Sequence, residues 1–242
     1  MDKLRNLLES YHLPVILDIA TGSGQFINLL TSLTSNFQKI VGIDASVGAI
    51  RVAKSHFEER SNIEFVVMDA STLAFDTDSI DIVTLSNSLH HFHNFETILM
   101  EISRVLKPGG CLIVCEMLAD PLTDAQISHR LIHHFAAKID RTLGIVHDDT
   151  YSKSTILELF QNQPKLLVQE SWDLDNLDES TATKDQIEGL LLTLDRLVDR
   201  LQDESLKPVF KAEAEAIKTY VLEHGFASAT EFIVVLKKLK LN

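Results

Sequence analysis

Short apolar runs alternate with helical patterns along the first half of the chain. Five runs are apolar and rich in β-branched residues, as in strands that a parallel sheet buries on both faces. Helical patterns separate several of them, and the last helix is followed by a proline–glycine stop, KPGG. This alternation predicts right-handed βαβ units and a doubly wound α/β sheet. The predicted strands are 14–20, 39–44, 63–69, 80–86 and 111–117, and the helices are 25–34, 47–60 and Phe95–Val105.

The second half of the chain is mostly helical. Thr183 and Gln186 form a capping-box pattern at the start of one long amphipathic helix, and Gly225 is placed to end the next. Two further apolar runs read as a sixth and a final strand. The predicted helices are 121–143, 152–160, 183–202 and 206–223, and the two strands are 166–172 and 229–239.

Composition narrows the class of protein. The 242 residues suit one domain, and a formal net charge of -13 argues against a nucleic acid as partner. No stretch is long and apolar enough to suggest a membrane span or a signal peptide, so we expect no membrane partner. Cys111 and Cys115 lie four apart on one predicted strand, too far apart for a disulfide, which fits a cytoplasmic protein.

The strongest chemical signal is the segment ILDIATGSGQF, in which a strand ends at Asp18 and a helix begins near Gly24. Small residues let a ligand approach the backbone, and a helix start offers free N–H groups. The dinucleotide fingerprint requires a small residue where this chain has Ile27. Asp18 would also repel a pyrophosphate, whereas it suits a cationic amino group. The charges therefore favour S-adenosylmethionine over NAD.

Further polar residues follow the next strands. Asp44 ends the second strand and suits the hydroxyls of a ribose. Asp69 ends the third strand, where its carboxylate and the Ala70 amide suit an adenine ring. LSNSLHHF follows the fourth strand. All these positions fall at the carboxyl edge of the predicted sheet, where open α/β sheets bind ligands.

This ordered set resembles the motifs of class I, Rossmann-like methyltransferases, and in particular the small-molecule group that includes quinone-biosynthesis enzymes. The resemblance covers about half the chain, from Val15 to Glu116, and implies a seven-stranded, mostly parallel sheet whose last strand is antiparallel. The sequence departs from the family pattern at Ala20, a position where the family usually has glycine. The resemblance implies that three parts of S-adenosylmethionine are bound by separate segments. The methionine part would be held by Asp18, Ala20, Thr21, Gly22 and Gly24, and the ribose by Asp44 with Ala45 beside it. The adenine would be held by Asp69 and Ala70, and Ser86 and Asn87 would form the pocket floor.

Two segments exceed the minimal fold, about 118–150 and 173–227. In this fold both leave the sheet at its carboxyl edge, so we expect a single domain over 1–242 with a helical cap above the cofactor pocket. A cap of this kind indicates a small, enclosed substrate. Alternatively, the apolar stripe of the helices within 183–223 forms a homodimer interface.

Histidine is unusually concentrated near the predicted pocket. We predict that His90, His147 and Tyr151 contact the substrate, because a hydroxyl or thiol acceptor benefits from a nearby base. A metal site is the less favoured alternative, and we expect no metal ligand. Its ligands would be His129 and His133, four apart on one helix, with Asp140 or His147 as the third.

The sequence thus predicts a methyltransferase that acts on a small organic acceptor through oxygen, nitrogen, sulfur or carbon. The acceptor atom and the oligomeric state are not readable from these motifs. Two alternatives stay open: a non-catalytic protein that binds the cofactor or scaffolds a partner, and, disfavoured by Asp18 and Ile27, an NAD-dependent oxidoreductase.

Overall fold

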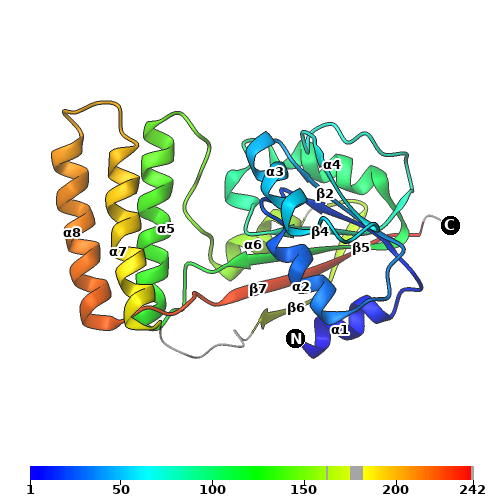
Figure 1. Cartoon of the computed structure of the whole chain (residues 1–242). Coiled ribbons are helices and arrows are strands. Elements are labelled where there is room, and N and C mark those ends of the chain that lie inside the picture. The colour runs from blue at the N-terminus through cyan, green and yellow to red at the C-terminus, as the bar shows by residue number, and fades with distance from the viewer. Residues whose placement is uncertain (162, 175–181, 241–242) are drawn as a thin grey trace.

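The computed structural model describes residues 1–161, 163–174 and 182–240. They contain a seven-stranded sheet in the order β3-β2-β1-β4-β5-β7-β6. Every neighbouring pair is parallel except the two that involve β7, which runs antiparallel to β5 and to β6. The predicted doubly wound sheet with an antiparallel last strand is confirmed (Figure 1). The strands are β1 Val15–Ile19, β2 Lys39–Asp44, β3 Ile63–Val67, β4 Ile80–Ser86, β5 Leu106–Met117, β6 Leu166–Leu174 and β7 Glu231–Lys238.

Helices cover both faces of the sheet. Successive side chains of a strand point to opposite faces, so each buried strand contributes residues to two apolar cores. On β1, Leu17 and Ile19 pack in one core with α4 and α6, whereas Ile16 packs in a second core with α1, α2 and α3. This two-sided burial explains the nearly continuous apolar runs of the central strands. The helices are α1 Asp2–Glu9, α2 Gln25–Leu33, α3 Val47–His56, α4 Phe95–Val105, α5 Asp124–Thr142, α6 Lys153–Phe160, α7 Lys184–Asp199 and α8 Lys207–His224, with a short 3₁₀ helix η1 at Leu89–His91.

Two strands differ most from the sequence prediction, and the other predicted elements differ from the structure by at most four residues at an end. β5 begins at Leu106 rather than at Cys111, because Leu106 already pairs with Ile80 before the chain bulges through KPGG and resumes pairing at Cys111. β3 is an edge strand, so its Val66 and Val67 are exposed rather than buried. Both differences arise from a strand's neighbours in the sheet, which a local pattern does not reveal.

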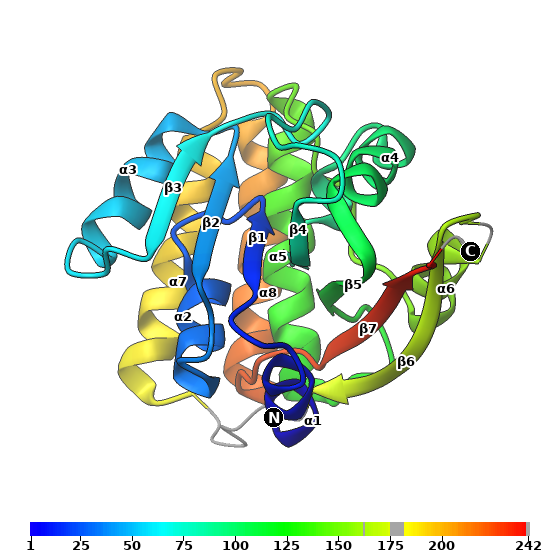
Figure 2. The same cartoon turned by 90° about the vertical axis from the view of Figure 1, so that its right-hand side faces the viewer.

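Helices α5, α7 and α8 pack around a third apolar core and form a bundle beyond the carboxyl edge of the parallel strands (Figures 1 and 2). Capping boxes begin two of them, at Thr123 with Gln126 and at Thr183 with Gln186, and Gly225 ends α8. The apolar stripe of α7 packs inside this bundle through residues such as Leu194 and Val198. A homodimer stays a prediction, and it would have to use other surfaces of α7 and α8.

Two further findings concern the cysteines and the length of the helices. Both cysteines are buried and free, as their spacing predicted. Within the described ranges, no helix combines the length and the apolar character that crossing a membrane requires.

Candidate functional site

The turn after β1 forms the base of the site. Asp18 is buried, and its two carboxylate oxygens accept hydrogen bonds from the hydroxyls of Thr21 and Thr84, each at 2.6 Å. The backbone then passes through positive φ angles at Ala20 (55°), Gly22 (56°) and Gly24 (85°). Gly24 has a second constraint, since a Cβ there would lie 2.7 Å from the Phe57 ring. The turn therefore needs small residues for its shape and its packing.

Ala20 is strained in this turn, because an L-residue with a side chain disfavours the left-handed region. We expect Ala20→Gly to raise the free energy of unfolding by about 1 kcal/mol, which corresponds to roughly 2–4 °C in Tm for a chain of this size. Thermal unfolding followed by circular dichroism measures the change. A lower Tm would mean that the entropy of the added glycine in the unfolded chain outweighs the relieved strain.

Carboxylates also stand at the carboxyl ends of β2, which pairs with β1, and of β3, which pairs with β2. Asp44 accepts the Gly22 amide at 2.9 Å and the Ser46 amide at 2.8 Å, so it ties the turn to β2. Asp69 follows β3 and accepts the Ser71 amide at 2.8 Å. Each oxygen of Asp44 keeps a second lone pair that a ligand hydroxyl can use.

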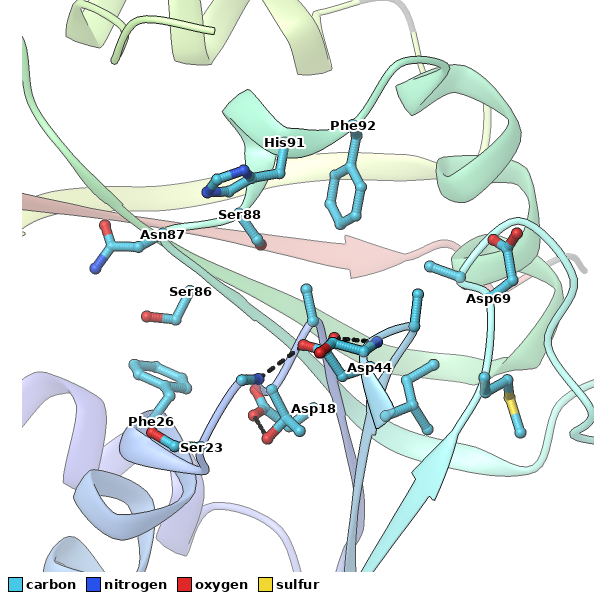
Figure 3. Close-up of a pocket in the computed structure, with 18 of the residues that line it drawn as sticks. Asp18, Ser23, Phe26, Asp44, Asp69, Ser86, Asn87, Ser88, His91 and Phe92 are labelled. Carbon is cyan, nitrogen blue, oxygen red and sulfur yellow. Dashed lines mark hydrogen bonds between the residues drawn. The ribbon is translucent and has the colours of Figure 1, made fainter. Parts of the chain in front are cut away.

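These groups surround a cavity of about 680 Å³. Ten of the eleven residues predicted to bind the cofactor line it, and Gly24 does not. Figure 3 shows Asp18, Asp44 and Asp69 on one side of the cavity, with His91 and Phe92 on the other. The ten lining residues are Asp18, Ala20, Thr21, Gly22, Asp44, Ala45, Asp69, Ala70, Ser86 and Asn87.

The cavity wall also contains residues that the motif reasoning missed. Phe26 comes from the start of α2, His91 and Phe92 follow β4, and Ile98 comes from α4. Ile145 comes from the segment after α5 and brings the first added segment to the cavity. Phe26 and Phe92 are the last residues of the segments ILDIATGSGQF and LSNSLHHF, and this position could have identified them, whereas no local pattern indicates Ile145.

Burial and nearby charges shift the ionisation of the lining groups. Burial, opposed by the Thr21 and Thr84 hydrogen bonds and assisted by Asp44, raises the pKa of Asp18 to about 6. Burial and the neighbouring His90 and His147 lower the pKa of His91 to about 4. His91 is therefore neutral at physiological pH and only weakly basic.

The three predicted substrate contacts lie outside the cavity wall. His90 is buried behind it, with its Nδ1 3.2 Å from Glu116 Oε2. His147 is also buried, with its Nδ1 2.7 Å from Asp140 Oδ2. The Tyr151 backbone pairs with the chain after β5, and its side chain packs against the core. His91, which was not among these three, does line the cavity. Contact of His90, His147 and Tyr151 with a substrate stays a prediction.

The structure separates His129 from the other residues considered as metal ligands, whereas His133, His147 and Asp140 lie together. His129 turns away and accepts the Ala229 amide at 3.0 Å through Nδ1. His133 instead points to His147 and His90, at 3.2 Å from each between Nε2 atoms. Although His129 and His133 are four apart on one helix, their side chains contact different groups and could not bind one metal ion together.

Ile27 bears on the dinucleotide alternative. It is fully buried in the core between the sheet and α2, at the position where the dinucleotide fingerprint needs a small residue for close helix–strand packing. The strand before the turn thus carries the acidic Asp18, and the helix after it carries the large Ile27, where a pyrophosphate-binding segment would carry neither.

Comparison with known proteins agrees with this geometry. Residues 17–114 match the family model described as "Methyltransferase domain". A demethylmenaquinone methyltransferase of Lactococcus lactis is 36% identical over 103 residues, and this match covers 42% of the chain and 41% of that protein. The chain therefore matches less than half the length of this curated relative.

Solved structures resemble the chain over nearly its whole length. A Bacillus halodurans protein classed as a methyltransferase superimposes with a TM-score of 0.65 at 20% identity, covering 99% of this chain and 98% of that one. The [4+2]-cyclase SpnF gives a TM-score of 0.63 at 20% identity, covering 98% and 80%. At such identities the likeness shows the fold alone. The chain therefore has the fold of the class I, Rossmann-like methyltransferases, and its residues 17–114 match a methyltransferase domain.

Proposed function

We propose that the protein transfers a methyl group from S-adenosylmethionine to a small organic acceptor. The observation that carries the proposal is the set of three carboxylates at consecutive strand ends, Asp18, Asp44 and Asp69, around one cavity. Their order suits an ammonium, a ribose and an adenine amino group in turn. When bound, S-adenosylmethionine supplies an electrophilic methyl group on its sulfonium.

The chain's own residues would position the reactants and exclude water, which is the main requirement for an in-line methyl transfer. Asp18 would hold the amino group, and Asp44 would hold the ribose hydroxyls. The neutral ring of His91 and the apolar Phe92 face the opposite side of the cavity (Figure 3). This wall favours an apolar or aromatic acceptor over a polymer, and the net charge of -13 supports the same choice.

We further propose that the added segments cap this cavity in a single domain. Ile145 supports the proposal because it lies in the cavity wall and directly follows α5, which carries the α7–α8 pair on its other side. Residues 175–181 of the second segment lie outside the described residues. The free, buried cysteines suit a reducing compartment, so we place the protein in the cytoplasm.

A substitution at Ile145 tests the cap. Ile145→Ala removes three carbons from a side chain that is 48% exposed, so we expect the KM for an apolar acceptor to rise about 5-fold, with the Kd for S-adenosylmethionine unchanged. The matched control is Leu222→Ala on α8, a large apolar residue that does not line the cavity. Equal effects of the two substitutions on KM would argue against a cap at Ile145.

Calorimetric titration is the experiment that tests the cofactor. We expect S-adenosylmethionine and its demethylated product to bind, and NAD not to bind. Release of that product with a panel of acceptors, including a naphthoquinol because curated relatives act on demethylmenaquinone by name, then tests transfer. Binding without transfer to any acceptor would favour the non-catalytic alternative, and the cyclase SpnF shows that this fold is not confined to proteins named methyltransferases.

A further inference from the structure

Three histidines from different parts of the chain converge behind the cavity wall. His90 lies in η1 after β4, His133 lies in α5, and His147 lies in the segment that follows α5. The Nε2 atom of His133 is 3.2 Å from that of His90 and 3.2 Å from that of His147. One nitrogen atom from each ring can be chosen so that the three atoms all lie within 4.8 Å of one another.

In two of these rings a carboxylate lies beside Nδ1, the outer nitrogen, which is the one that does not face the other rings. Glu116, fully buried at the end of β5, accepts the amides of Ser88 and Leu89 through Oε1 and faces Nδ1 of His90 through Oε2. Asp140 faces Nδ1 of His147 in the same manner. A nitrogen beside a carboxylate carries the proton, so the hydrogen-bond partners assign a lone pair to Nε2 of both rings.

The three Nε2 atoms, which face one another, cannot all form hydrogen bonds among themselves. His133 Nε2 has close neighbours in His90 and His147, which both present lone pairs, and a neutral ring can donate one proton from that atom. One close nitrogen pair is left without a proton between its members. A cation bound between the three nitrogens would use all three lone pairs.

The geometry matches a particular kind of cation. Zinc bound by imidazole has Zn–N distances of about 2.0–2.1 Å, so tetrahedral ligand atoms lie roughly 3.3 Å apart. The two separations that involve His133, 3.2 Å each, agree with this value, and the ligand atoms of His90 and His147 lie within 4.8 Å of each other. Carboxylates on the outer nitrogens of ligating histidines are also the usual supporting groups of such sites. The buried Glu116 adds a negative charge that compensates a cation.

We propose that His90, His133 and His147 form a binding site for a divalent transition-metal ion of the zinc type, with Glu116 and Asp140 as positioning residues. Three neutral imidazoles leave the fourth position of a tetrahedral ion for water or another ligand. The site would join α5 and the segment after it to the turn that follows β4. It lies one ring behind the cavity, because the ring of His91 packs at a tilt against that of His147, with centroids 4.1 Å apart, and His91 itself lines the cavity.

Zinc titration of the untagged, full-length protein tests the site, with no cofactor or acceptor present. We expect about one zinc ion per chain by elemental analysis after dialysis, and a raised Tm on addition of zinc. His133→Gln should weaken zinc binding more than 10-fold. The matched control is His129→Gln on the same helix, which lies outside the cluster and should bind zinc as the wild type does.

X-ray absorption on the wild-type zinc complex gives a result that depends on no variant folding. Three imidazole nitrogens at about 2.0 Å would support the site. A wild type that retains no zinc, zinc held mainly by oxygen, or equal zinc affinity of His133→Gln and the wild type would each overturn it. Because neither measurement involves methyl transfer, the proposed function can fail without affecting this result, and the reverse also holds.

Discussion

Replacing Asp44 with alanine is expected to raise the Kd for S-adenosylmethionine about 100-fold or more. The carboxylate would accept both ribose hydroxyls, and a hydrogen bond to a charged group contributes about 1.5–3 kcal/mol. The loss of two such bonds therefore corresponds to at least two orders of magnitude in affinity. Calorimetric titration of the variant beside the wild type measures the change.

The substitution also affects the turn, because Asp44 accepts the amides of Gly22 and Ser46. Asp44→Asn separates the two effects, since it keeps one acceptor oxygen for the turn while removing the charge. We expect its Kd to lie between those of the wild type and the alanine variant. Glu64→Ala is the control, because this carboxylate on neighbouring β3 pairs with Lys39 and does not line the cavity. An unchanged Kd for Asp44→Ala would remove the ribose assignment.

Most of the sheet could be predicted from the sequence because its signals are local. Apolar runs identified the strands, and the capping-box pattern at Thr183 marks a helix start that the structure contains. The strand-end carboxylates were also accessible, because the carboxyl ends of parallel strands meet at one edge. Their position relative to a strand was enough to bring Asp18, Asp44 and Asp69 to one cavity.

The parts that were missed depend on contacts between distant segments. Ile145 reaches the cavity because α5 runs out from the sheet and the following segment returns. The histidine cluster needs the same return, since it joins residues 43 and 14 positions apart. Helical spacing paired His133 with His129, but the tertiary structure paired it with His90 and His147. A sequence pattern reports neighbours on one element and not those across elements.

Cofactor affinity is expected to fall about 10-fold as pH decreases from 7 to 5. The pKa of Asp18 is about 6, raised chiefly by burial. At pH 5 roughly nine-tenths of this carboxyl group would be protonated, and only the ionised form attracts the ammonium of the cofactor. Other groups in the wall do not account for the change, because the pKa of His91 is about 4 and a hydrogen bond from the Ser71 amide lowers the pKa of Asp69.

The stability of the free protein should change in the opposite direction. A carboxyl group whose pKa is raised on folding binds more protons in the native state than in the unfolded state, from about pH 4 to about pH 6. Its contribution to the free energy of unfolding therefore increases as pH falls through that window, by up to about 3 kcal/mol for a shift of this size. Lower pH thus weakens cofactor binding while Asp18 itself opposes unfolding.

Asp18→Asn isolates this group. The amide keeps polar contact with the hydroxyls of Thr21 and Thr84 but cannot ionise, so the variant should bind S-adenosylmethionine at least 10-fold more weakly at pH 7 and show no further weakening at pH 5. At pH 7 its free energy of unfolding should equal or exceed that of the wild type, because no charge is buried. Titrations and urea unfolding at both pH values provide the comparison. If the variant kept the 10-fold pH dependence, another group would control cofactor binding, and the buried charge at the end of β1 would have a structural role only.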